Sequence, residues 1–208
     1  MKIGICGGTF DPFHHGHVEP ILAAREAMEW TRIIYFVAYR QPFKEKGCSA
    51  SGYHRFAMAA LATESIDDVW VSSWELEREG VSYTVDTLEH LRSEYPDATL
   101  DWIIGDDNLA RLGEWKRIDR IFELANFVVL TRLSPDHAAE AGGATPDCVC
   151  DAASRPSHGA IVYARNDTIP VSSTEIRRRV RDGESIDELV DPRVSRYIQH
   201  NRLYQETS

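Results

Sequence analysis

The sequence KIGICGGTFDPFHHGH (residues 2–17) decides the fold of this chain. Its apolar opening, residues 2–6, predicts a buried β-strand, and Gly7 and Gly8 predict the turn that ends the strand. Residues from about 17 to 29 have the alanine, leucine, glutamate and methionine content of a helix. The chain therefore opens with a strand, a glycine turn and a helix, in the order expected of an α/β protein.

The same alternation continues along the chain. Runs of β-branched and aromatic residues predict further strands at 32–37, 69–72, 100–104, 126–131 and 160–163. Helical sequence is found at about 53–64, 83–89, 108–124, 173–182, 185–190 and 192–199, with Thr84 as an expected N-cap. This pattern predicts an α/β, Rossmann-like fold: a doubly wound, mostly parallel sheet with helices on both faces, followed by a short helical C-terminal region at 172–204.

Length and composition favour a single domain spanning residues 1–208. With 43% apolar and 27% charged residues, the chain can bury a full core. Residues 133–159 are rich in small and polar residues without periodicity, and we expect an irregular loop or insertion there. The formal net charge of -10 argues against binding along a nucleic-acid backbone, because such binding depends on neutralising phosphates.

The N-terminal sequence lacks the long apolar stretch of a secretory signal, and no run is long enough to span a membrane. We therefore expect a cytoplasmic protein with four free thiols, at Cys6, Cys48, Cys148 and Cys150. A metal site made from the last two cysteines with His137 and His158 is an alternative, although their CxC spacing lacks a matching second pair. An irregular surface loop is the expected setting.

The glycine turn and the histidines after it carry the first chemical hypothesis. Around Gly7 and Gly8, backbone N–H groups can approach a phosphate at the positive end of the following helix. A plain tight turn is the alternative, and the glycines by themselves favour it. His14 and His17, three residues apart, can face one ligand and donate to phosphate oxygens. A metal site made from the two histidines is the alternative. It is incomplete without a nearby acidic ligand or a third histidine, and His15 is expected to point elsewhere.

Four motifs, in order, resemble those of one family. GGTFDPFHHGH (7–17) resembles the GxFDxxHxGH signature of the nucleotidyltransferase superfamily, and VSSTEIR (171–177) resembles its second signature, (I/V)SSTxIR. With SYTVDTL (82–88) and IIGDDNL (103–109), the pattern is most similar to the bacterial nicotinate-nucleotide adenylyltransferases, over nearly the whole chain. The resemblance implies a single Rossmann-like nucleotidyltransferase domain.

The resemblance also implies that ATP lies across the turn after the first strand, with His14 and His17 on its phosphates. The implied ATP-binding residues are Gly7, Gly8, Thr9, Phe10, His14, His17, Gly105, Asp107, Asn108, Ser172, Ser173, Thr174 and Arg177. From the residues alone, the hydroxyl-rich helix start at Ser172 offers free amides to the outer phosphates, and Arg177 follows about one turn later. A plain helix cap is the alternative for this motif.

A second set of residues is implied for a mononucleotide: Lys44, Tyr83, Thr84, Trp115 and Arg132. By resemblance, Trp115 stacks on the pyridine ring and the backbone at Tyr83 and Thr84 holds its carboxylate, tasks that suit an aromatic ring and helix-start amides. A core tryptophan, an ordinary N-cap and an exposed lysine are the alternatives. The family commonly has Pro-His-Lys where this chain has Pro42, Phe43 and Lys44. Phe43 in place of the histidine affects one expected contact to a phosphate or to the substrate, while the lysine is kept.

The resulting hypothesis is adenylyl transfer from ATP to nicotinate mononucleotide, giving nicotinate adenine dinucleotide and pyrophosphate in NAD biosynthesis. His17, His14, Lys44 and Arg177 are the expected catalytic residues, acting by alignment and charge stabilisation without a covalent intermediate. Mg²⁺ is expected on the phosphates of ATP, with no protein ligand. ATP and nicotinate mononucleotide are the expected partners, without nucleic acid or membrane, and a homo-oligomer stays open.

Two alternatives to this hypothesis stay open. Transfer to nicotinamide mononucleotide or phosphopantetheine, or cytidylyl in place of adenylyl transfer, keeps the fold and changes the reaction. The second alternative is a non-catalytic module that binds the nucleotide without transferring its adenylyl group. The SYTVDTL segment and the Gly-Glu-Trp sequence at 113–115 favour a pyridine nucleotide as acceptor. The complete set of His14, His17, Lys44 and Arg177 favours an enzyme.

Overall fold

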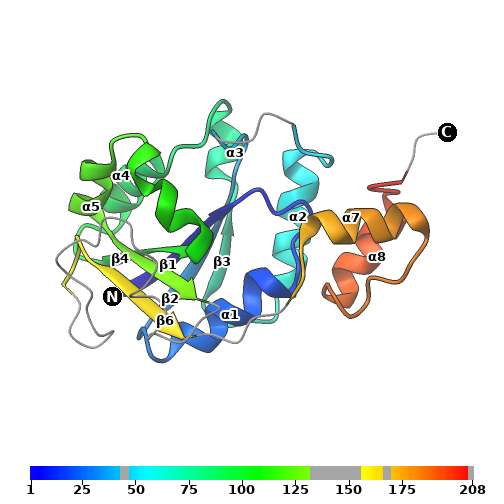
Figure 1. Ribbon diagram of the computed structural model, residues 1–208, viewed down its shortest axis with the longest axis horizontal. Coiled ribbons are helices and arrows are strands. Elements are labelled where there is room, and N and C mark those ends of the chain that lie inside the picture. The colour runs from blue at the N-terminus through cyan, green and yellow to red at the C-terminus, as the bar shows by residue number, and fades with distance from the viewer. Residues whose placement is uncertain (43–46, 132–155, 166–169, 206–208) are drawn as a thin grey trace. The chain divides into compact units, whose positions relative to one another are not determined.

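The computed structural model describes residues 1–42, 47–131, 156–165 and 170–205 (Figure 1). Several of the predictions above fall outside these residues. They concern the lysine and its preceding phenylalanine, the arginine after the fifth strand, three members of the alternative metal site and most of the irregular segment: Lys44, Phe43, Arg132, His137, Cys148, Cys150 and residues 133–155.

A six-stranded sheet forms the framework, and its strands match the predicted runs closely. They are β1 (Lys2–Gly8), β2 (Arg32–Val37), β3 (Val69–Ser72), β4 (Thr99–Gly105), β5 (Asn126–Thr131) and β6 (Ile161–Arg165). Their order is β3-β2-β1-β4-β5-β6, and the pairs β1–β4, β4–β5 and β5–β6 are parallel. The order reverses where β1 meets β4, as a doubly wound sheet requires, so the predicted Rossmann-like α/β fold is confirmed.

Helices follow or separate the strands. They are α1 (His15–Arg25), α2 (Gly52–Thr63), α3 (Trp74–Arg78), α4 (Thr84–Glu94), the 3₁₀ helix η1 (Asp106–Glu114), α5 (Ile118–Leu124), α7 (Ser173–Asp182) and α8 (Pro192–His200). In the part of the chain that the structure describes, no helix combines the length and the apolar character that crossing a membrane requires.

The structure differs from the sequence-based expectation at four places. The helical sequence expected at about 108–124 is divided into two elements, η1 and α5, and α3 was not expected. Residues 185–190 form turns rather than a helix, because the Ser185 hydroxyl bonds the Asp187 carboxylate and backbone N–H and so competes with helical bonding. Helix α4 begins at Thr84, so Tyr83 and not Thr84 is its N-cap.

The chain consists of two compact units. The first unit contains Met1–Gly7, Pro20–Ile34 and Tyr83–Thr168, and the second unit contains Gly8–Glu19, Tyr35–Ser82 and Ile169–Ser208. The expectation of one nucleotidyltransferase domain stays a prediction.

The core of the first unit is built from the apolar side chains of parallel strands. Ile103, Val128 and Val162 are neighbours across β4, β5 and β6, and all three are buried. Asp101 is fully buried beside them, where Trp30 Nε1 donates to its carboxylate at 2.7 Å and Asn126 Nδ2 at 3.0 Å. A buried carboxylate needs such partners, so these bonds fix the start of β4.

The core of the second unit lies where α2 packs against α8. Met58 of α2 is fully buried, as are Val194 and Ile198 of α8. At the edge of this contact, the His54 Nδ1 and the Tyr197 hydroxyl are 2.9 Å apart. The C-terminal helix is thus part of the folded second unit.

Candidate active site

The residues between β1 and α1 form a buried turn in the second unit. We call residues 8–17 the histidine turn. Thr9, Phe10, Asp11 and His14 are each less than 9% exposed, although three of the four are polar. Phe10 has a left-handed backbone with φ of 53°, which costs about 1 kcal/mol or more in a residue with a side chain. The surrounding contacts must therefore hold this conformation.

Four carbonyl groups of the histidine turn accept hydrogen bonds from other parts of the second unit. The donors are Ala38 N–H to Gly8 (2.9 Å), Arg55 Nη1 to Thr9 (2.5 Å), Arg177 Nη1 to Asp11 (2.6 Å) and Ser173 Oγ to Pro12 (3.0 Å). These bonds fix the backbone. They also engage the partly negative ends of the peptide groups, which makes the turn a better neighbour for an anion.

His14 and His17 lie together at the start of α1. Their rings stack with centroids 3.6 Å apart and planes 22° apart. The His14 backbone N–H donates to Nδ1 of His17 at 3.3 Å, and the Tyr35 hydroxyl donates to the His17 carbonyl at 2.9 Å. A ring nitrogen that accepts a backbone N–H carries no proton, so neutral His17 carries its proton on Nε2. This N–H is a donor of the kind that a phosphate oxygen accepts.

The His14 ring is held in its neutral form. Burial first, and then the charge of neighbouring His15, lower the pKa of the His14 imidazole from 6.5 to about 4. Its Nδ1 is buried and has no hydrogen-bond partner among the described residues. A buried polar atom without a partner is uncommon and indicates a ligand or water that completes the site.

Two glycines allow the close packing of this region. A Cβ on Gly16 would lie 2.9 Å from Cγ1 of Val171 and 3.2 Å from the His14 ring. A Cβ on Gly8 would lie 2.5 Å from the Phe10 ring. Both positions therefore exclude a side chain, which explains the glycine within the HxGH sequence.

The start of α7 reaches the same turn. The Ser172 hydroxyl caps the helix by accepting the Glu175 N–H at 3.2 Å, while Ser173 and Arg177 bond the turn carbonyls described above. Arg177 also donates to the Thr174 hydroxyl at 3.3 Å. The structure thus brings His14, His17 and the SSTEIR motif together within the second unit.

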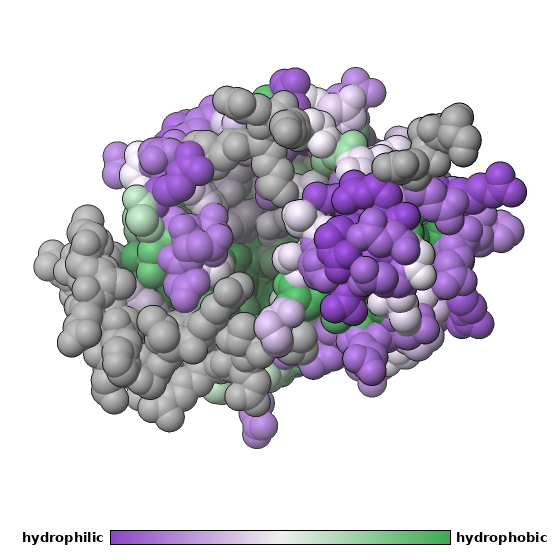
Figure 2. Space-filling view, turned by 45° about the vertical axis from the view of Figure 1, so that its right-hand side comes forward, coloured by the Kyte–Doolittle hydropathy of each residue, from purple (hydrophilic) through white to green (hydrophobic). Residues whose placement is uncertain are grey.

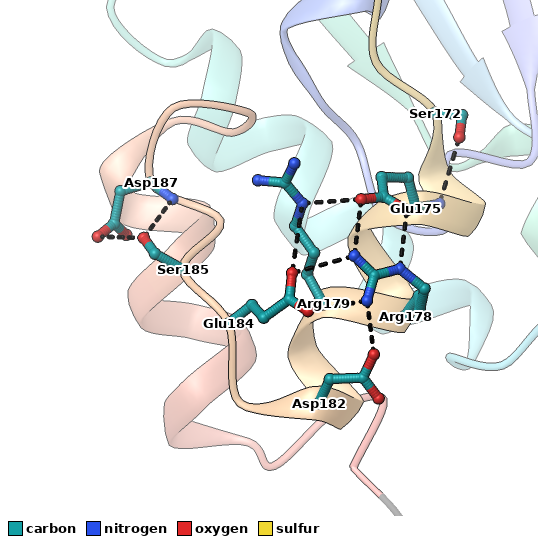
Figure 3. Close-up of polar contacts among 8 residues, drawn as sticks. All are labelled: Ser172, Glu175, Arg178, Arg179, Asp182, Glu184, Ser185 and Asp187. Atoms are coloured by element: carbon teal, nitrogen blue, oxygen red, sulfur yellow. Dashed lines mark hydrogen bonds and ion pairs between the residues drawn. The ribbon is translucent and has the colours of Figure 1, made fainter.

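The other arginines of α7 belong to the surface. The Arg178 guanidinium lies among the carboxylates of Glu175, Asp182 and Glu184 (Figure 3). Hydrogen bonds from Arg178 and Arg179 lower the pKa of Glu175 to about 2. Hydrophilic colouring gathers over the right-hand side of Figure 2, the side on which Figure 1 labels α7 and α8. Of the three consecutive arginines, only Arg177 bonds to the histidine turn.

The remaining predicted ATP-binding residues, apart from Gly7 at the end of β1, belong to the segment that follows β4 in the first unit. We call Gly105–Lys116 the recognition segment. Gly105 is the N-cap of η1, and a Cβ there would lie 2.6 Å from the Asp107 carboxylate. Asn108 Nδ2 donates to Asp107 Oδ1 at 3.1 Å. Asp107 is exposed, so these residues form a local polar group at the end of the strand.

The predicted mononucleotide residues that the structure describes also lie in the first unit. Tyr83 and Thr84 open α4, where no side chain caps the helix. The Lys116 ammonium lies 4.0 Å from the centre of the Tyr83 ring and 3.8 Å from the Asp86 carboxylate. The Trp115 ring packs edge-on against Phe127 of β5, with centroids 5.7 Å apart, and is half-buried. The Trp115 ring is therefore packed against the core on one side and partly exposed to solvent.

Three residues at the histidine turn were not singled out from the sequence as site residues: Asp11, Arg55 and Tyr204. Arg55 is 2% exposed and holds the Thr9 carbonyl, and its Nε has no hydrogen-bond partner among the described residues. The Asp11 carboxylate accepts from the N–H groups of Ser49 and Ala50 and from the Tyr204 hydroxyl. An arginine within the mostly apolar sequence of α2 is the one signal that could have revealed part of this cluster.

The described residues show no group of three histidine, cysteine, aspartate or glutamate side chains that could hold a metal ion. Among the described residues, His14 and His17 therefore have no third side chain beside them that could complete a metal site. Cys6 and Cys48 are free thiols, as expected.

Comparisons with known proteins point to one family. Residues 5–179 match the family model described as cytidylyltransferase-like. The chain is 37% identical to a "Probable nicotinate-nucleotide adenylyltransferase" of Chlorobaculum parvum, over 99% of this chain and 100% of that one. It is also 37% identical to a protein of the same name from Gemmatimonas aurantiaca, over 99% and 93% of the two chains.

A solved structure has the same fold. The Plasmodium falciparum nicotinic acid mononucleotide adenylyltransferase complexed with NaAD superposes with a TM-score of 0.72 and 18% identity. The match covers 98% of this chain and 97% of that one.

Proposed function

The chain belongs to the nicotinate-nucleotide adenylyltransferases of the cytidylyltransferase-like family, and from this membership we propose which of its residues carry the reaction. It is an enzyme of NAD biosynthesis that transfers the adenylyl group of ATP to nicotinate mononucleotide, giving nicotinate adenine dinucleotide and pyrophosphate. His14, His17 and Arg177, together with Lys44, are proposed to hold the reacting phosphates.

The observation that carries this proposal is the geometry of His14 and His17. The two rings stack at 3.6 Å beside a turn in which four carbonyls already have partners, and the buried Nδ1 of His14 has none among the described residues. The neutral His14 imidazole and the His17 ring stacked on it are hydrogen-bond groups, which suits phosphate oxygens that gain charge during the reaction. The glycines of the turn and Ser172–Thr174 at the start of α7 are proposed to bind the phosphates through their amides.

The reaction needs alignment more than proton transfer. An oxygen of the mononucleotide phosphate attacks the α-phosphorus of ATP, the new oxygen–phosphorus bond forms, and the bond to the β-phosphate oxygen breaks. Pyrophosphate leaves with that electron pair. The attacking phosphate is already ionised at neutral pH, so no general base is required. The proposed work of His14, His17 and Arg177 is to orient the phosphates and to stabilise the developing negative charge.

Nucleotidyl transfer of this family uses a divalent metal ion with ATP, and we propose Mg²⁺. We propose that the phosphates of ATP carry the ion, and the buried Nδ1 of His14, which has no partner among the described residues, supports a phosphate oxygen at this position. When bound, the ion neutralises phosphate charge. The protein residues then position the same phosphates through hydrogen bonds.

The recognition segment is proposed to bind the two nucleosides. Gly105, Asp107 and Asn108 stay our prediction for the adenosine of ATP. Trp115, with the helix start at Tyr83 and Thr84 and with Arg132, stays our prediction for the pyridine ring and its carboxylate. The half-buried Trp115 ring and the uncapped start of α4 support these roles.

An assay that compares three acceptors tests which acceptor the enzyme uses. Pyrophosphate release is measured with ATP and one of nicotinate mononucleotide, nicotinamide mononucleotide or phosphopantetheine. We expect the largest kcat/KM with nicotinate mononucleotide. Release with phosphopantetheine alone contradicts the proposal. Replacing ATP by CTP in the same assay tests the adenylyl specificity.

Calorimetric titration with ATP separates an enzyme from a module that only binds nucleotides, because a pure binder gives heat without pyrophosphate.

We also propose a cytoplasmic location, which the free thiols of Cys6 and Cys48 support. ATP and nicotinate mononucleotide are the proposed partners. The number of subunits and the absence of nucleic-acid binding stay predictions that a sedimentation experiment and a binding assay can test.

A further inference from the structure

Asp11 connects the histidine turn to two other parts of the second unit. Its side chain is buried, and its carboxylate accepts hydrogen bonds from the N–H groups of Ser49 (2.7 Å) and Ala50 (3.1 Å). The Tyr204 hydroxyl donates to Oδ1 of the same carboxylate at 2.8 Å. A buried carboxylate is stable only when its oxygens are paired, so all three donors contribute to its position.

Tyr204 is built to stay a donor in this pair. Burial first, and then the neighbouring Asp11 carboxylate, raise the pKa of the Tyr204 hydroxyl above its usual range, so it keeps its proton. Tyr204 and Arg202 both have left-handed backbones, with φ of 64° and 51°. This conformation is unfavourable for residues with side chains, and contacts such as the bond to Asp11 must offset it.

The position of Asp11 affects the two histidines through short connections. Asp11 follows Phe10, which has a left-handed backbone and whose ring lies edge-on against the His17 ring, with centroids 4.9 Å apart. His14 follows three residues after Asp11. A shift of Asp11 therefore changes the setting of both the Phe10 ring and the backbone that carries the stacked imidazoles.

We propose that Tyr204 is a positioning residue for adenylyl transfer, because its hydroxyl holds the Asp11 carboxylate and thereby fixes the turn that carries His14 and His17. This inference rests on the proposed function of the two histidines. Tyr204 itself touches no reacting atom in the proposal. Its effect passes through Asp11, so it is expected to alter turnover more than substrate binding.

The first test compares Tyr204→Phe with Tyr197→Phe. Both changes remove one phenol hydroxyl from the C-terminal part of the second unit, but Tyr197 contacts His54 of α2 and not Asp11. We expect Tyr204→Phe to lower kcat about tenfold, the effect of losing one hydrogen bond to a charged group, with both KM values within about twofold. Tyr197→Phe should keep the kcat of the wild type. Equal kcat values for the two variants overturn the proposal.

A double-mutant cycle tests whether the effect passes through Asp11. Asp11→Ala should lower kcat more than Tyr204→Phe, because it removes the acceptor of all three hydrogen bonds. If Tyr204 acts through Asp11, adding Tyr204→Phe to Asp11→Ala lowers kcat by less than about twofold further. A full additional tenfold loss contradicts the proposed route.

An activity-independent measurement separates this inference from the proposed function. The NMR signals of the histidine imidazoles are recorded for the wild type, Tyr204→Phe and Tyr197→Phe. We expect the signals of His14 and His17 to shift in Tyr204→Phe alone, even if no acceptor releases pyrophosphate. In that outcome the proposed function fails, while the finding that Tyr204 fixes the histidine turn stands. Unchanged signals in Tyr204→Phe overturn the positioning role.

Discussion

The histidine turn (residues 8–17) and the recognition segment (Gly105–Lys116) both follow a parallel strand, but they are held in different ways. The histidine turn is mostly buried, and its polar groups bond residues far away in the sequence, such as Arg55, Arg177 and Tyr204. Half of the residues of the recognition segment are exposed and one, Leu112, is buried, and several of its side chains bond near neighbours, such as Asn108 with Asp107 and Arg111 with Glu114.

This difference separates two tasks. Phosphate transfer needs groups fixed to within a fraction of an ångström, and buried bonds from several segments provide that. Recognition of a base or a pyridine ring tolerates side chains that adjust when the ligand arrives. The two regions should therefore respond differently to mutation: turnover should change at the first, and binding at the second.

The largest expected effect is that of His17→Ala at the histidine turn. We expect kcat to fall by about 10²–10³-fold, because the lost donor acts mainly on charge that develops in the transition state. The Kd of ATP, measured by calorimetry, should change by less than about threefold. His15→Ala is the matched control, since the His15 ring pairs with the Glu19 carboxylate at 3.1 Å. A kcat for His17→Ala equal to that of the control removes His17 from the mechanism.

A second effect concerns the stability of the histidine turn at low pH. In the folded protein the pKa of His14 is about 4, against 6.5 for the unfolded chain, so the unfolded state binds the proton more readily between these values. The neutral His14 therefore stabilises the folded state fully above pH 6.5. As pH falls toward 4 this stabilisation is lost, and the free energy of unfolding decreases by about 3 kcal/mol. Urea unfolding at pH 7 and pH 4.5 should show a larger loss for the wild type than for His14→Asn. Equal losses contradict the assignment.

A smaller effect is expected at the recognition segment. Trp115→Ala should raise the KM for nicotinate mononucleotide about tenfold, because a stacking surface is lost, while the KM for ATP stays within about twofold. Trp115→Phe should recover most of the affinity. Because Trp115 also packs against Phe127, thermal unfolding of both variants is measured alongside. A rise in the KM for ATP of the same size contradicts the division between the two regions.

The smallest effect is expected from Arg178→Gln on the surface of α7. Its ion pairs are exposed, so we expect kcat/KM within about twofold of the wild type and a small decrease in Tm that disappears in about 1 M salt. Arg177→Gln changes the neighbouring residue, which bonds the turn instead. We expect it to lower kcat by about tenfold or more. Similar kinetics for the two variants contradict the distinction between the arginine that bonds the histidine turn and the arginine that bonds surface carboxylates.

The sequence predicts the framework well because runs of β-branched and aromatic residues leave a clear signal. The apolar runs at 32–37, 69–72 and 126–131 match β2, β3 and β5 at both ends. Local side-chain chemistry caused the main errors. Residues 106–114, with two aspartates, an asparagine and a glycine, form a 3₁₀ helix rather than an α-helix.

For the candidate site, local motifs and long-range contacts differ in how well a sequence reveals them. HxGH and SSTEIR are visible because each is compact, and the structure brings the two together within the second unit. Tyr204 was not visible, because it meets Asp11 across 193 positions and nothing near it in the sequence marks a site. Arg55 meets Thr9 across 46 positions. A single sequence carries no record of such pairings.

The pairing of Asp11 with Tyr204 has a consequence for the timing of protein synthesis. A ribosome adds about 5–20 residues per second, so about 10–40 seconds separate the two residues. During that interval the nascent chain already contains both histidines, and for the last part of it Arg177 as well. It lacks the hydroxyl that holds the Asp11 carboxylate. Under the positioning role proposed for Tyr204, full turnover begins only when the last segment of the second unit has been made and folded.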